Sequence, residues 1–131
     1  MKYLCLIYDD EKKIGALAKS EMDAFMGEYF AFTEGIRKSG HYVAGEALKP
    51  VESATTIRAR NGKISTTDGP FAETKEQLLG FYLVDCKSLE EAIDVARSLP
   101  SVRTIFEIRP VKLFFPGGEI SPILPPRAAS S

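Results

Sequence analysis

Three side chains of this sequence are candidates for acid–base chemistry. His41 is the only histidine of the chain, and histidine is the side chain that most readily exchanges a proton near neutral pH. Asp68 precedes Gly69-Pro70, which reverses the chain and leaves the carboxylate few directions in which to point. Glu46 lies in an expected strand, where a carboxylate needs solvent or a partner. Held beside a substrate, these groups would act as general acids or bases, so they predict proton-transfer chemistry.

Two of these residues also have a simpler structural interpretation. Asp68 would accept backbone N–H bonds from Phe71 or Ala72 and cap a short helical turn over residues 72–77. We favour this cap, with a position at a pocket rim as its secondary role. His41 follows a helix-ending glycine, where a histidine is more often a surface or capping residue than a catalytic one. Both interpretations of each residue stay open on the sequence alone.

A second group of residues has the character of a small-molecule pocket. An arginine on a strand suits a carboxylate or enolate oxygen, although cross-strand ion pairing on a wet sheet face is the simpler expectation. Aromatic rings between helix and sheet are core residues by default and would line any cavity there. Charged residues after the Asp-Gly-Pro turn are most simply a solvated loop face. The candidate ligand-binding residues are Tyr29, Arg58, Phe71, Glu73, Lys75 and Tyr82.

Composition argues against several other functions. The 131 residues are 44% hydrophobic, which is typical of one folded domain. Seventeen Lys and Arg residues against eighteen Asp and Glu give a net charge of −1, unlike the basic excess of a nucleic-acid binder. No apolar run approaches the roughly 18 residues that cross a bilayer, and no secretory signal is recognisable. We therefore expect a cytoplasmic protein with neither nucleic acid nor membrane as a partner.

Cofactor motifs are also absent from the sequence. There is no CxxC pair and no glycine-rich phosphate loop, so we expect no metal centre and no nucleotide or other cofactor. Cys5 and Cys86 each lie in an apolar run and are expected to be buried, reduced thiols.

The elements that must position these residues are strands and two helices. We expect one helix capped by Ser20 and ended by Gly40, and a second helix opened by the capping box that begins at Ser88. Asn61-Gly62 predicts a two-residue hairpin turn. The expected strands cover residues 3–8, 42–48, 54–60, 63–67, 80–86 and 104–109.

Without the hairpin, the order of elements is βαββαβ, the ferredoxin-like α+β unit. Both helices of that unit cover the same face of an antiparallel sheet. The strands at 3–8 and 81–84 are apolar without alternation, which predicts burial on both faces. The most economical cover for the second face is a second copy of the chain. The sequence therefore predicts a homodimer.

The run DGPFAETKE at residues 68–76, followed by a glycine-aromatic strand, resembles the signature of the DGPF group in the YCII-related family. The resemblance covers residues 1–112 as one domain and leaves residues 113–131 as a proline-rich tail. It implies a small bacterial protein that forms a dimeric ferredoxin-like α+β barrel, with a cavity beside the sheet. Some relatives pair a histidine on the first helix with an aspartate. This chain has Tyr29 and Phe32 on that helix, so that mechanism is not expected here.

Two functions follow as hypotheses. One is proton-transfer chemistry of lyase or isomerase type on a small molecule, with Asp68, Glu46 or His41 as base and an arginine as charge stabiliser. The alternative is a non-catalytic ligand-binding or regulatory accessory protein, because relatives are encoded beside alternative sigma factors. Titratable groups around a concave pocket favour the first hypothesis, and a pocket lined only by aromatic rings favours the second.

Overall fold

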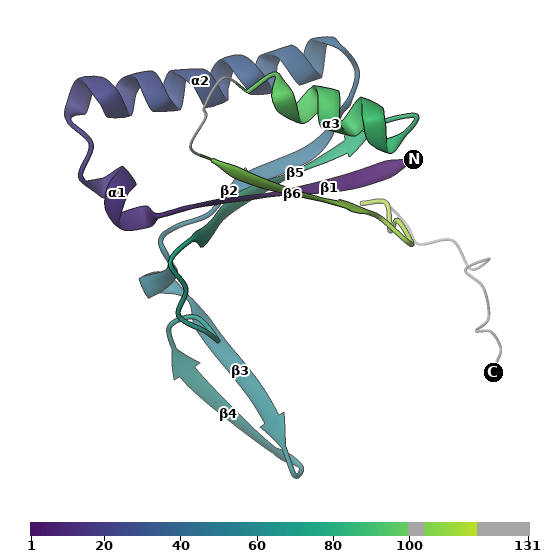
Figure 1. The fold of residues 1–131 in the computed structure, drawn as a ribbon. Helices are drawn as coiled ribbons and strands as arrows, with labels where there is room; N and C mark the ends of the chain where they lie inside the picture. The colour runs from purple at the N-terminus through teal and green to yellow at the C-terminus, as the bar shows by residue number, and fades with distance from the viewer. Residues whose placement is uncertain (100–103, 118–131) are drawn as a thin grey trace, which may run out of the picture.

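A four-stranded antiparallel sheet organises the chain (Figure 1). The computed structural model describes residues 1–99 and 104–117. The strand order is β2-β5-β1-β6, with β1 (Lys2–Asp9) and β5 (Gln77–Asp85) in the centre and β2 (Tyr42–Ala47) and β6 (Ile105–Pro110) at the edges. This is the order of a ferredoxin-like unit, so the predicted α+β class is confirmed.

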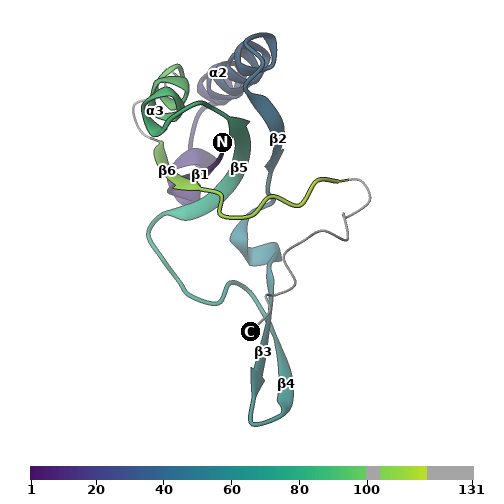
Figure 2. The same cartoon turned by 90° about the vertical axis from the view of Figure 1, so that its right-hand side faces the viewer.

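Two helices, α2 (Lys19–Lys38) and α3 (Leu89–Arg97), cover the same face of the sheet (Figures 1 and 2). Burial alternates along β1, so that every second side chain faces the helices. Phe32 of α2 meets Tyr82 edge to face, with ring centroids 5.2 Å apart. The buried core consists of Tyr3, Cys5, Ile7, Phe32, Ile36, Val84, Cys86, Ala92 and Leu99. Each large apolar side chain buried in this way contributes about 1.5–3 kcal/mol to folding.

The other face of the sheet carries the residues of β1 and β5 that point away from the helices. Leu4 lies opposite Leu83, and Leu6 lies opposite Phe81. All four are only partly buried. These strands were expected to be buried on both faces. Within the single chain, the face that packs against the helices is buried and the opposite face is only partly buried.

The two cysteines behave as predicted. Cys5 and Cys86 are both buried and neither forms a disulfide. Burial raises the pKa of the Cys5 thiol to about 11, and Cys86 adds to the effect. Cys5 is therefore a small apolar packing group at neutral pH.

The end of α2 follows its sequence signals, and its start does not. Gly40 has a φ of 83°, and the N–H groups of Gly40 and His41 donate to the carbonyls of Arg37 and Ile36, a Schellman motif. The expected cap at Ser20 is wrong. The capping position is Ala18, two residues before Ser20, and the Glu21 carboxylate accepts the Ala18 N–H at 2.9 Å. None of the described helices is both long enough and apolar enough to cross a bilayer.

The structure has one short helix more than the two that were expected. Residues Glu11–Gly15, directly after the first strand, form α1. Asp10 caps it, its Oδ1 accepting the N–H groups of Lys12 and Lys13 at 2.9 and 3.4 Å. A capping aspartate directly after a strand is the local signal for this helix.

The predicted hairpin is present and projects from the body on the side of the sheet opposite the helices (Figures 1 and 2). After a short 3-10 turn at Val51–Ser53, β3 (Thr55–Arg60) and β4 (Lys63–Asp68) form their own two-stranded sheet. Asn61 and Gly62 have φ values of 51° and 78°, as a type I′ turn requires. One face of this arm exposes Ile57 and Ile64.

Two glycines provide a test of the packing. A Cβ atom at Gly80, in β5, would lie 2.5 Å from the backbone oxygen of Glu46, whereas one at Gly27, within α2, would meet nothing within 4 Å. We expect Gly80→Ala to lower the free energy of unfolding by about 1–3 kcal/mol through overpacking. Gly27→Ala should raise it by about 0.5–1 kcal/mol through helix propensity. Urea unfolding at one fixed protein concentration measures the free energy of unfolding of both variants. Equal changes in the two variants would contradict the close contact between β2 and β5.

Candidate functional site

An open cleft of about 700 Å³ lies at the carboxyl end of β1. Four segments meet there: the end of β1, α1, the loop before β5 and the start of β6. We call it the Asp9 cleft. Its lining residues are Asp9, Asp10, Lys13, Ala16, Lys75, Glu76 and Ile105.

Asp9 contributes a buried carboxylate to this cleft. The residue is 5% exposed, because the alternation of β1 turns it toward the helices. Its Oδ1 accepts the N–H of Asp10 at 2.7 Å. Aspartate is rarely buried to this degree in a core, so a buried carboxylate in the wall of a cleft is a candidate acid–base group.

Hydrogen bonds clamp α1 and the loop before β5 to each other. The Gln77 Oε1 accepts the Glu11 N–H at 2.9 Å, and the Gln77 Nε2 donates to the Thr74 carbonyl at 2.5 Å. The Glu11 carboxylate in turn accepts the Val51 N–H at 3.3 Å from either oxygen. These bonds hold in place the two segments that carry Lys13 and Lys75, both of which line the cleft.

Tyr29, a predicted ligand-binding residue, lies close to this end of the sheet. Its hydroxyl and that of Thr104, the residue before β6, are 3.2 Å apart. Burial raises the pKa of the Tyr29 phenol; the hydrogen bond with Thr104 opposes this, and the negative charge of Asp9 adds to it. The phenol therefore stays protonated at neutral pH.

Tyr82, another predicted ligand-binding residue, belongs to the core instead of the cleft. Its hydroxyl is 2.5 Å from that of Thr33 on α2, and its ring packs against Phe32 and Tyr42. Burial raises the pKa of its phenol, although the hydrogen bond with Thr33 lowers it. Its part in the structure is to attach α2 to β5.

The DGPF segment lies at the base of the projecting hairpin, and most of it is exposed. Asp68 ends β4 opposite Thr55, so the expected cap is wrong. Residues 72–77 form bends and the start of β5, where a helical turn was expected. The Arg58 Nη2 donates to the Phe71 carbonyl at 2.9 Å, while Phe71 is 76% exposed. The Gly69 N–H continues the hairpin by donating to Ala54, so pairing, not capping, determines this reversal.

The remaining candidates lie in other places. Glu73 is exposed on the loop beyond the hairpin. Glu46 is exposed on β2, opposite Phe81 and on the sheet face away from the helices. His41 is half-buried near the amino end of β1, with its Nδ1 2.6 Å from the Ser39 hydroxyl. Of the nine predicted site residues, only Lys75 lines the Asp9 cleft.

Sequence reasoning missed Asp9, Asp10 and Lys13 as site residues. The available signal was a run of charged residues directly after a buried strand. A second, smaller hollow of about 370 Å³ lies between α3 and β6, lined mostly by aliphatic and aromatic carbon and by Arg97. Of these two hollows, the Asp9 cleft is the one lined mainly by titratable side chains.

The fold and cleft define a ferredoxin-like α+β chain with a charged cleft at one end of its sheet. A family model for the YCII-related domain matches residues 1–115, so the chain belongs to the YCII-related family. An uncharacterised protein of Rhizobium meliloti (strain 1021) is 43% identical over 121 residues, covering 89% of this chain and 97% of that protein. The family that the sequence resemblance indicated is confirmed. The assignment to its DGPF group stays a prediction.

The position of Asp68 leads to a stability prediction. The side chain is exposed at the end of β4, so Asp68→Ala should change the free energy of unfolding by less than about 0.5 kcal/mol. The matched variant is Ser88→Ala at the start of α3, where the serine Oγ accepts the Glu91 N–H at 3.2 Å. That change should cost about 1 kcal/mol. Chemical denaturation measures the free energy of unfolding of both variants. If Asp68→Ala lowers it as much as Ser88→Ala does, Asp68 is a cap after all.

Proposed function

We propose that the chain binds a small organic molecule in the Asp9 cleft and acts on it by proton transfer of lyase or isomerase type. The observation that carries this proposal is the buried Asp9 carboxylate in the wall of a cleft that also holds Lys13 and Lys75. Abstraction of a proton next to a carbonyl group requires a base and a cationic group that face the same small cleft.

The charges of the lining indicate the kind of molecule. Asp9, Asp10 and Glu76 oppose the two lysines, so the cleft suits one anionic or carbonyl oxygen better than a phosphate group. A lysine ammonium would stabilise the negative charge that develops on that oxygen, while Asp9 takes the proton from the adjacent carbon. Lactones, and aromatic acids that carry a hydrogen on the carbon next to the carboxyl group, have this chemistry.

The experiment measures binding and proton transfer separately. Thermal shift screens a panel of small aromatic acids and lactones, and proton NMR in D2O follows loss of carbon-bound hydrogen signals from those that bind. Asp9→Asn should retain binding and slow exchange by about 10²-fold or more, because general acid–base catalysis contributes about 10²–10⁴-fold. Lys75→Ala should weaken binding.

Lys63→Ala, an exposed lysine on the hairpin, is the control and should match the unmodified protein in both measurements. Exchange that survives Asp9→Asn would exclude Asp9 as the base. Binding without any exchange would support the alternative, a ligand-binding or regulatory accessory protein.

We further infer that the protein acts as a homodimer. The sheet face opposite the helices has the partly exposed side chains of Leu4, Leu6, Phe81 and Leu83, and apolar surface of this kind favours association. The hairpin extends from the same side (Figure 1). A second copy placed sheet to sheet would cover this face and lie beside the apolar side of the arm.

A charge on that face should disrupt the dimer. We expect Leu6→Glu to shift sedimentation from a species of two chains to one chain at micromolar concentration, because it places a carboxylate in an apolar interface. The matched control is Phe30→Glu on α2, where the native residue is already 68% exposed. The control should leave assembly unchanged. A single-chain species in the unmodified protein would contradict the proposal.

A further inference from the structure

Three side chains with metal-binding atoms meet at the end of the sheet farthest from the Asp9 cleft. His41 comes from the corner between α2 and β2, Cys86 follows β5, and Glu91 lies in the first turn of α3. The ring nitrogen, sulfur and carboxylate oxygen all lie within 4.8 Å of one another. Sequence spacing alone does not reveal this group, because His41 and Cys86 are far apart in the chain.

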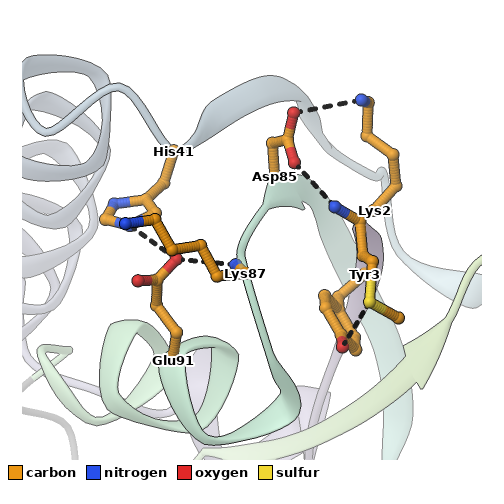
Figure 3. A network of polar contacts seen from close by, with 7 residues as sticks. Lys2, Tyr3, His41, Asp85, Lys87 and Glu91 are labelled. Carbon is orange, nitrogen blue, oxygen red and sulfur yellow. Dashed lines mark hydrogen bonds and ion pairs between the residues drawn. The ribbon is translucent and has the colours of Figure 1, made fainter.

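The histidine ring is already oriented. The Ser39 hydroxyl lies 2.6 Å from Nδ1, which directs Nε2 toward Glu91, 3.5 Å from its Oε1 (Figure 3). Histidines that bind metals nearly always have their second nitrogen hydrogen-bonded in this way. Ser39 is therefore suited to position the ring for a ligand at Nε2.

The other two residues are also fixed in place. The Glu91 Oε1 accepts the Lys87 N–H at 2.9 Å, as Figure 3 shows. Backbone bonds hold the strand end beside His41: the Asp85 N–H donates to the His41 carbonyl, and the Cys86 N–H donates to the Met1 carbonyl, both at 2.8 Å. Hydrogen bonds therefore hold the segments that carry the three ligand residues in place before any ion binds.

The donor set indicates which ion fits. Sulfur, imidazole nitrogen and carboxylate oxygen together suit Zn²⁺, which takes four ligands in a tetrahedron. Zinc–ligand distances of about 2.0–2.3 Å separate the ligand atoms by about 3.5 Å, so the cluster must contract by about an ångström. The side chains of His41 and Glu91 are 24% and 34% exposed, which gives an ion access from solvent.

We propose that His41, Cys86 and Glu91 bind one Zn²⁺ ion, with a water molecule in the fourth position. The Cys86 thiol loses its proton to solvent as its sulfur binds the ion. The ion joins the α2–β2 corner, the end of β5 and the start of α3. Because the three residues come together only in the folded chain, zinc binding stabilises that state by mass action.

Cobalt(II) is the probe, because it replaces zinc and reports its ligands spectroscopically. Chelator-treated full-length protein titrated with Co²⁺ should bind one ion per chain and develop the near-ultraviolet absorption of a thiolate–cobalt bond. Cys86→Ala should abolish that absorption. Cys5→Ala, which removes the other buried cysteine, should retain it.

Two further variants complete the test. His41→Ala removes a half-exposed ligand and should lower Co²⁺ affinity at least tenfold, even if Cys86→Ala does not fold. Ser39→Ala should lower the affinity about 10-fold, since loss of a hydrogen bond that orients a ligand costs about 10–100-fold. Adding Zn²⁺ should raise the melting temperature of the native protein and not that of His41→Ala. Co²⁺ binding without thiolate absorption, or with equal affinity in His41→Ala, would overturn the proposal.

Discussion

The hydrogen bonding of β1 on both of its edges fixes the rest of the molecule. β1 pairs with β5 along Lys2–Asp9 and with β6 along residues 3–8. Side chains alternate along a strand, so this register decides which half of them faces the helices. A slip by one residue would turn Asp9 out of its cleft and exchange the apolar residues of the two faces. The core, the open sheet face and the Asp9 cleft therefore all depend on one pairing.

Much of the fold could be predicted from the sequence, because several of its signals have a single local solution. Asn61-Gly62 specifies a tight hairpin turn, Gly40 ends a helix in the left-handed region, and Ser88 accepts the backbone N–H three residues ahead. Each signal acts within a few residues and is independent of distant parts of the chain. The start of β5 is different, since Gln77 is held there by Glu11, which lies 66 residues earlier in the sequence.

The candidate site was harder to predict, for a related reason. Asp9 looks like any polar residue after a strand until the register of β1 shows which way it points. The DGPF segment was predicted to contribute site residues because it is rich in charged and turn-forming residues. The structure places Asp68 and Phe71 at the base of an exposed arm, and only Lys75 of the predicted residues in the cleft. Residue type indicated the chemistry, but long-range pairing determined the location.

The pairing of β1 also has a consequence for how the chain folds during synthesis. β1 leaves the ribosome before both of its partners, because β5 begins only at Gln77 and β6 only at Ile105. Translation adds about 5–20 residues per second, so β1 waits on the order of 5–20 s before its second edge is paired. Until β5 has emerged, the apolar segment Tyr3-Leu4-Cys5-Leu6-Ile7-Tyr8 has no partner strand, and exposed segments of this kind are what chaperones bind. Pairing between distant strands also slows folding once synthesis ends, which prolongs the exposure of this segment.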